Sequence, residues 1–127
     1  MRKRLLIIAI ICLLLSLWGL KEIFAMDKWD KTDITLATTA GILHMADWAQ
    51  SRNVAANGLN YIEMNPLMGR HPSVDTVDVY FIGTATVLGL ATHYLPSKWR
   101  KRLLTGWVVV GGISVGNNIN VGVGFGF

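Results

Sequence analysis

Three long stretches without a charged residue limit what this chain can fold into. They run from Leu5 to Leu20, from Val79 to Ala91 and from Leu103 to Phe127. Apolar stretches near 20 residues match a hydrocarbon layer of roughly 30 Å, because an α-helix rises about 1.5 Å per residue. With 127 residues, 52% of them hydrophobic, the chain is too apolar for an ordinary soluble domain. The sequence therefore predicts an all-α membrane protein, a small bundle of three or four transmembrane helices.

Basic residues gather at the edges of the apolar stretches. The formal net charge is +4, and its two clusters are MRKR at the N-terminus and SKWRKR at residues 97–102. Lys and Arg beside an apolar stretch anchor a helix to anionic headgroups and set its orientation. A nucleic-acid-binding face would instead need basic residues spread over a folded surface, with aromatic residues between them. The expected partner is the lipid bilayer, followed by other membrane proteins or a second copy of the chain, and nucleic acid is not expected.

Residues 1–25 have the layout of an export signal, with a basic start, an apolar stretch and Ile23-Phe24-Ala25 in the place of a cleavage site. Because Ile23 is bulky where small residues are usual, we favour a retained signal anchor over a cleaved signal peptide. Residues 26–127 then form a single helical membrane domain, placed in the bacterial inner (cytoplasmic) membrane. The single cysteine, Cys12, lies in the first apolar stretch, so the chain can form no internal disulfide.

The membrane domain begins with a moderately polar helix. Thr32-Asp33 is a candidate N-cap for a helix over residues 34–54, which Asn57-Gly58 ends. This helix either crosses the bilayer facing the protein interior or lies at the surface. Four spans would place SKWRKR outside, whereas three spans, with residues 34–54 not crossing, place both basic clusters in the cytoplasm. We favour three spans for that reason.

Turn-forming residues mark residues 57–73 as a motif loop. Pro66 and Pro72 stiffen it, and Gly69 permits a positive φ. Ser73 is a candidate N-cap for the next helix, which Pro96 stops, and the last apolar segment is expected to begin at Leu103.

The last ten residues, NINVGVGFGF, alternate with period two and end in Phe, like the terminal strand of an outer-membrane barrel. A barrel needs at least about eight such strands, and the upstream stretches have helical length. We therefore favour a Gly-rich helix end or a short extended tail.

Polar residues that could share a site are scattered along the membrane domain. His44 and Asp47 share a helix face, and uncompensated polar atoms in lipid each cost several kcal/mol, so such groups are expected to bond one another. No HExxH, CxxC or tight His-x-His spacing occurs, so no metal or other cofactor is expected. Four residues remain as weak candidate ligands for a divalent metal: His44, Asp47, Glu63 and His71. The whole candidate polar cluster comprises His44, Asp47, Gln50, Glu63, Asn65, His71, His93 and Asn118. Asn117 and Asn120 are expected to face inward beside Asn118.

The string GISVG at residues 112–116 matches the GxSxG elbow of serine hydrolases in letters only. In serine hydrolases such an elbow follows a strand, and the catalytic histidine comes later in the sequence. Here the last histidine is at residue 93, before the string. Small residues four apart fit close helix packing better, and this interpretation covers Ala85, Gly89, Gly112 and Gly116.

Four strings resemble a group of small uncharacterised bacterial and phage membrane proteins: DWAQSR at 47–52, EMNPLMGRHPS at 63–73, VDVYF at 77–81 and HYLP at 93–96. The likeness extends over residues 27–127 and rests on the patterns Asp-Trp-x-Gln and Glu-x-Asn-Pro-x-x-Gly-x-His-Pro. The resemblance implies that polar residues belong to a shared architecture, namely His44, Asp47, Glu63, Asn65, His71 and Asn118. It implies no reaction, and the catalytic residues, if there are any, are unknown.

These observations favour an integral inner-membrane protein with a structural or accessory role, acting through protein and lipid contacts, more than an enzyme. The alternative is a membrane-embedded metal-dependent enzyme or ion-handling protein that uses the His/Asp/Glu cluster. A second alternative is a phage-type, holin-like lysis protein, since its small size and basic ends fit that class.

Overall fold

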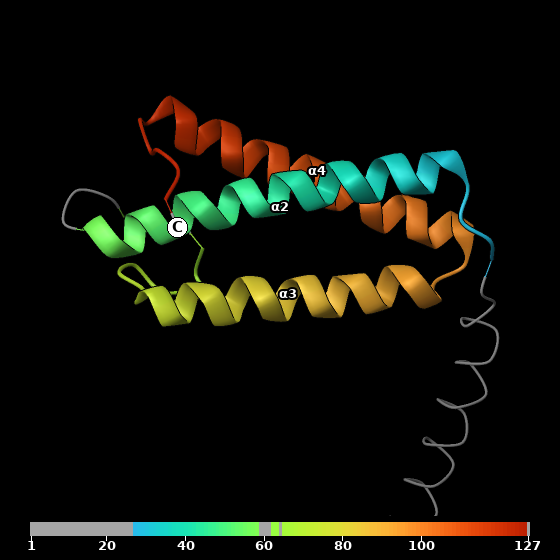
Figure 1. Ribbon diagram of the computed structural model, residues 1–127, viewed down its shortest axis with the longest axis horizontal. Coiled ribbons are helices and arrows are strands. Elements are labelled where there is room, and N and C mark those ends of the chain that lie inside the picture. Colours follow the sequence, from blue (N-terminus) through green and yellow to red (C-terminus); the bar gives the residue numbers. More distant parts are fainter. Residues whose placement is uncertain (1–26, 59–61, 64, 127) are drawn as a thin grey trace, which may run out of the picture.

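The computed structural model describes residues 27–58, 62–63 and 65–126, and these residues form three helices and no strand. Helix α2 is Lys31–Asn57, α3 is Val74–Tyr94 and α4 is Ser97–Asn120 (Figure 1). The all-helical class predicted from the sequence is confirmed for this part of the chain. The predicted signal anchor or signal peptide at residues 1–25 lies outside the described residues.

Helix α2 starts earlier than predicted, because its N-cap is Asp30 and not Thr32-Asp33. The side chain of Asp30 accepts a hydrogen bond from the Asp33 backbone N–H at 2.9 Å, and the Asp33 side chain accepts one from the Asp30 backbone N–H at 3.1 Å. This reciprocal pair is a capping box, which satisfies two backbone donors at the start of the helix.

The predicted limits of α3 are confirmed at both ends. The side chain of Ser73 accepts from the Thr76 backbone N–H at 3.2 Å and caps the first turn. Leu95 has an extended backbone, with ψ at 142°, because the ring of Pro96 excludes the helical conformation from the residue before it.

The prediction that the last segment begins at Leu103 is wrong, since α4 starts at Ser97 and includes the basic cluster. The carboxylate of Asp27 accepts from the Ser97 backbone N–H at 2.8 Å, across 70 residues of sequence. A carboxylate at a helix N-terminus satisfies an unpaired donor and complements the helix dipole. The cap of α4 therefore comes from a distant segment and leaves no local signal.

Helices α2 and α4 run in the same direction, and α3, which lies between them in the sequence, runs in the opposite direction. Arg100 bonds Asp33, and Ser114 bonds Asp47, each pair 67 residues apart, so the two helices keep one register along their length. Figure 1 shows α4 crossing behind α2, and among the three helix pairs α3 and α4 contact each other least.

Helix α4 approaches α2 closely at Gly111. A Cβ added there would lie 3.1 Å from the Cβ of Leu43, whereas one added at Gly89, Gly112 or Gly116 would meet no atom within 4 Å. These three glycines are exposed, and Ala85 is half-buried. Within the chain, α4 thus approaches α2 closely at Gly111, the residue before Gly112. The role of Ala85, Gly89, Gly112 and Gly116 in helix packing stays a prediction.

Gly111→Leu is expected to lower the free energy of unfolding by about 1–3 kcal/mol, because the added side chain forces α2 and α4 apart. Gly112→Leu is the matched control, since the same side chain meets open space there. Chemical unfolding of both variants in detergent measures the difference. An equal loss of stability in the two variants would contradict the contact between α2 and α4 at Gly111.

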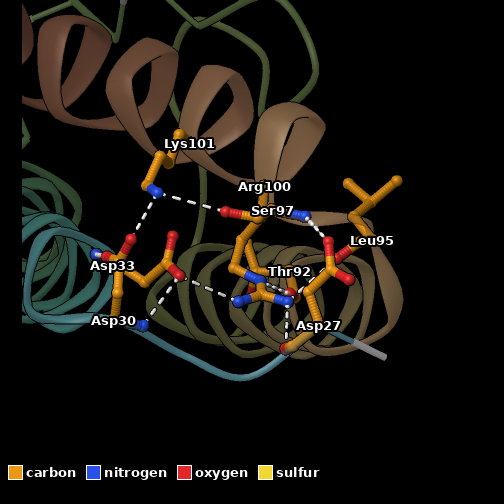
Figure 2. A network of polar contacts seen from close by, with 8 residues as sticks. All are labelled: Asp27, Asp30, Asp33, Thr92, Leu95, Ser97, Arg100 and Lys101. Atoms are coloured by element: carbon orange, nitrogen blue, oxygen red, sulfur yellow. Dashed lines mark hydrogen bonds and ion pairs between the residues drawn. The ribbon is translucent and has the colours of Figure 1, made fainter. Parts of the chain in front are cut away.

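The N-termini of α2 and α4 and the C-terminus of α3 meet around one fully buried arginine. The guanidinium of Arg100 donates to Oδ2 of Asp33 at 2.9 Å, and to the backbone oxygens of Thr92 at 3.0 Å, Asp27 at 2.8 Å and Leu95 at 3.1 Å (Figure 2). Both side chains of the Arg100–Asp33 ion pair have 0% exposure. We call these five residues the Arg100 clasp. It joins all three helices at one end of the bundle.

A second ion pair lies on the surface of this end. The ammonium of Lys101 donates to Oδ2 of Asp30 at 2.5 Å (Figure 2). This bond, helped by the Asp33 backbone N–H, lowers the pKa of Asp30 below its ordinary value of 3.8. Since the folded-state pKa is the lower one, the pair adds stability above pH 3.8 that is lost as the pH falls through the lowered pKa.

Candidate functional site

Four polar side chains meet in the C-terminal halves of the parallel helices α2 and α4. Asp47 and Gln50 lie about one turn apart on α2 and face Ser114 and Asn118 on α4. The hydroxyl of Ser114 donates to Oδ1 of Asp47 at 2.7 Å, and Nδ2 of Asn118 donates to the same oxygen at 3.3 Å and to Oε1 of Gln50 at 3.1 Å. Nε2 of Gln50 is buried and has no hydrogen-bond partner among the described residues. We call these four residues the interhelical polar cluster.

A cavity of about 650 Å³ lies beside the interhelical polar cluster, between α2, α4 and the motif loop. Its volume falls within the range of small-molecule sites. Eight of its lining residues carry a polar side-chain group: Asp47, Ser51, Glu63, Asn65, Tyr80, Ser114, Asn117 and Asn118. Two helices and a loop therefore bring hydrogen-bonding groups to one space.

The loop wall of the cavity is held by bonds within the motif. The Glu63 backbone N–H donates to the Arg70 carbonyl at 3.0 Å, and the Glu63 carboxylate accepts from the Asn65 N–H at 2.9 Å. The Asn65 side chain accepts from the Leu67 N–H at 3.0 Å, and Gly69 takes a φ of 79°. The Asx turn and the positive φ are the roles that Asn and Gly play in tight turns. The loop thus presents Glu63 to the cavity in a fixed position.

An apolar contact fastens the loop to the helices. Met68 is buried against Val77 and Phe81 of α3, and Trp48 and Tyr80 pack around these three. The rings of Trp48 and Phe81 are stacked with centroids 6.2 Å apart. Met68 therefore anchors the loop over one end of α2 and α3.

The C-terminal tail closes another side of the cavity. After α4 the chain turns at Gly122, with φ at 83°, and Val123 is buried and lines the cavity. The Gly126 N–H donates to the Ala49 carbonyl at 3.1 Å, and Nδ2 of Asn53 donates to the Gly124 carbonyl at 3.1 Å. The alternating sequence at the C-terminus is therefore a short tail packed on α2 up to residue 126, and not a strand.

The three histidines lie apart from one another. His44 is one turn from Asp47, but its Nε2 lies 3.0 Å from the Phe81 carbonyl oxygen of α3, and its ring lies 5.3 Å from that of Trp107 on α4. His71 is exposed beside a separate shallow pocket. His93 is exposed near the end of α3, with its ring against Tyr94. None of the three lines the cavity of Asp47 and Glu63.

The structure thus brings together part of the candidate polar cluster. Asp47, Gln50 and Asn118 are bonded, and Glu63 and Asn65 line the same cavity. Asn117 and Asn120, expected to face inward, are exposed. Within the described ranges, no three His, Cys, Asp or Glu side chains are grouped so that they could hold a metal ion.

Sequence reasoning missed Ser114 as a member of the site and Arg100 as a buried group. A seven-residue spacing could have indicated both. Asp33, Ala40, Asp47 and Val54 follow it on α2, and on α4 the residues Arg100, Trp107 and Ser114 do so too. Inward positions recur about every seven residues where two helices pack side by side.

Comparison of the chain with family models, curated proteins and solved structures finds no match. The resemblance to small bacterial and phage membrane proteins stays a prediction, and the function is inferred from the geometry of the chain itself.

Proposed function

We propose that the protein is an integral membrane protein with a structural or accessory role, in which α2, α3 and α4 cross the bilayer together. It acts through contacts with lipid and with other membrane proteins. One observation carries this proposal, namely the placement of polar side chains inside the bundle and large apolar side chains outside it.

The bundle interior contains polar side chains beside its apolar core. Among the described residues, nine buried ones are hydrophobic, and five are polar or charged: Asp33, Gln50, Ser51, Thr92 and Arg100. Large apolar residues are exposed on the outer faces of all three helices, including Ile42, Met45, Ile82, Val87, Leu90, Val109, Val110 and Ile113. Water would favour the opposite arrangement, whereas lipid favours this one, because polar groups there must be satisfied within the protein.

Helix α3 has the length and composition of a membrane span. It is the one helix of the described residues long and apolar enough to cross a membrane. Its 21 residues extend about 31 Å at about 1.5 Å per residue, close to the hydrocarbon thickness of roughly 30 Å. Only 11% of its most apolar window is buried inside the chain, which leaves most of that surface for lipid.

Helices α2 and α4 are less apolar because of residues that face each other. Asp47, Gln50 and Ser51 of α2, and Ser114 and Asn118 of α4, lie at the contact between the two helices or line its cavity. Polar residues turned toward a helix partner are compatible with a membrane span. Because α2 packs along both other helices, a bilayer crossed by α3 and α4 is crossed by α2 as well. This proposal replaces the predicted topology in which residues 34–54 do not cross.

The clasp end of the bundle has the composition of a membrane interface. Trp29 and Trp99 are exposed there, and the guanidinium of Arg102 lies 4.8 Å from the Trp99 ring centroid. Trp and basic residues are enriched where helices leave the hydrocarbon layer. The cytoplasmic placement of this end stays a prediction.

Val87→Arg tests the proposal, because Val87 is 66% exposed near the middle of α3. In a membrane span this change is expected to cost about 2.5–3.5 kcal/mol of insertion free energy and to reduce the protein recovered in alkali-washed membranes. In a water-soluble bundle the same change would be harmless. Ile34→Arg, 55% exposed in the first turn of α2, is the matched control and should insert normally. Recovery of wild type and Val87→Arg in the soluble fraction alike would overturn the proposal.

A further inference from the structure

The cavity between α2, α4 and the motif loop carries a charge imbalance. Asp47 on α2 and Glu63 on the loop line the same space of about 650 Å³. No Lys, Arg or His is among the described residues that line it. The guanidinium of Arg52 on α2 is engaged elsewhere, since it pairs with Asp78, and the His44 ring contacts a backbone carbonyl of α3.

The hydrogen bonds within the chain do not neutralise the negative charge of the two carboxylates. Asp47 accepts from the Ser114 hydroxyl and the Asn118 amide, and Glu63 accepts from the Asn65 backbone N–H. All three donors are neutral. Asp47 and Glu63 are both partly buried, and a carboxylate that the protein shields from water attracts a cation more strongly, so a cationic ligand would gain from entering this cavity.

Six aliphatic or thioether side chains form an apolar part of the cavity wall. Val54, Met68, Val110, Val121 and Val123 line it, together with Ile62. Val110 and Val121 are more than half exposed, so the cavity opens along that side of α4. A small inorganic cation would leave this apolar wall without contacts, whereas a cation with an alkyl group would cover it.

We propose that this cavity binds an amphiphilic ammonium ion, with its nitrogen facing the carboxylates of Asp47 and Glu63 and its alkyl group against the apolar wall. A zwitterionic phospholipid also carries an ammonium group, but its phosphate would be repelled by the same two carboxylates. The ligand is therefore a free alkylammonium compound. This site is independent of the proposed structural role, and its charge complementarity holds whether or not the bundle lies in a bilayer.

Binding of hexyltrimethylammonium to the purified full-length protein in a neutral detergent tests the site. The ion should raise the unfolding midpoint in a saturable way, and calorimetric titration gives its Kd. Asp47→Asn and Glu63→Gln should each weaken binding by at least about ten-fold, because each removes one negative charge from the cavity. Asp75→Asn should leave the Kd unchanged, since Asp75 is exposed in the first turn of α3 and does not line the cavity.

Several results would overturn the proposal. They are an absence of saturable binding, an equal effect of uncharged hexanol, or the same loss of affinity in Asp75→Asn as in Asp47→Asn. Stronger stabilisation by magnesium chloride would assign the carboxylates to a metal, and stronger competition by a short-chain phosphatidylethanolamine would assign the cavity to lipid.

Glu63→Gln and one further variant, Val110→Trp, keep the test decisive if Asp47→Asn does not fold. Glu63→Gln changes only the loop wall, and Val110→Trp fills the open side of the cavity from an exposed position. Both should abolish or weaken binding, and unchanged binding in both would overturn the site. Membrane fractionation of the same preparations tests the proposed function separately, because binding can be measured in detergent or in plain buffer.

Discussion

Arg100→Leu is expected to lower the free energy of unfolding by about 3–5 kcal/mol, because it leaves the Asp33 carboxylate buried without its cation. Leucine also cannot donate to the backbone carbonyls of Thr92 and Leu95, which end α3. Both effects act at the point where all three helices meet. Equilibrium unfolding of the full chain in mixed detergent micelles measures the loss.

Two comparisons separate the Arg100 clasp from a general effect of charge. Arg102→Leu removes an exposed guanidinium two residues away and should change stability by less than about 0.5 kcal/mol. The double variant Asp33→Asn/Arg100→Leu should recover part of the loss, because no buried charge remains while the amide oxygen can still cap α2. If Arg100→Leu unfolds like Arg102→Leu, the clasp does not stabilise the bundle.

Phe81→Ala should have the second largest effect, near the lower end of about 3–5 kcal/mol. The Phe81 side chain is 2% exposed, and its ring lies 5.0 Å from that of His44 and stacks on that of Trp48. In a membrane or micelle, lipid or detergent surrounds the aromatic ring in the unfolded state too, so removing the ring changes little in hydrophobic transfer energy. The loss of stability therefore comes mainly from the empty cavity and the broken ring contacts. The same micelle unfolding assay measures it.

Ile82→Ala is the control for Phe81→Ala, since Ile82 is the next residue on α3 and is 54% exposed. It should cost less than about 1 kcal/mol. A larger loss in Ile82→Ala than in Phe81→Ala would mean that the outward face of α3 is buried in a contact with another molecule.

The motif IEMNPLMGRHPS at residues 62–73 combines a structural role with the proposed ligand-binding one. Asn65 and Gly69 form the turn, and Met68 anchors it in the apolar core. Glu63 supports the turn through the Asn65 N–H and also lines the cavity. The Asn65 N–H bonds only one oxygen of the Glu63 carboxylate in the described contacts. The folded loop and the proposed ammonium ligand can therefore use the same side chain together.

The sequence by itself determined the features that depend on neighbouring residues. Ser73 caps α3, Pro96 ends it, and the pair Asn65 and Gly69 forms a tight loop, because each signal acts within a few residues of its own backbone. The start of α2 was misplaced, since Asp30, Thr32 and Asp33 are all acceptable caps and only the reciprocal bond of Asp30 and Asp33 selects one.

Only the tertiary structure decided which residues face one another across α2 and α4. Residues 67 positions apart in the sequence face each other across α2 and α4. Arg100 therefore points inward to Asp33, although the basic cluster to which it belongs predicted lipid anchoring. For the same reason Gly111, and not Gly112, contacts α2 closely. The same register joins Asp47 to Ser114, while His71 and His93 lie on the surface. A one-residue step along a helix rotates a side chain by about 100°, so composition and spacing within one helix leave the facing residues undetermined until its partner is placed.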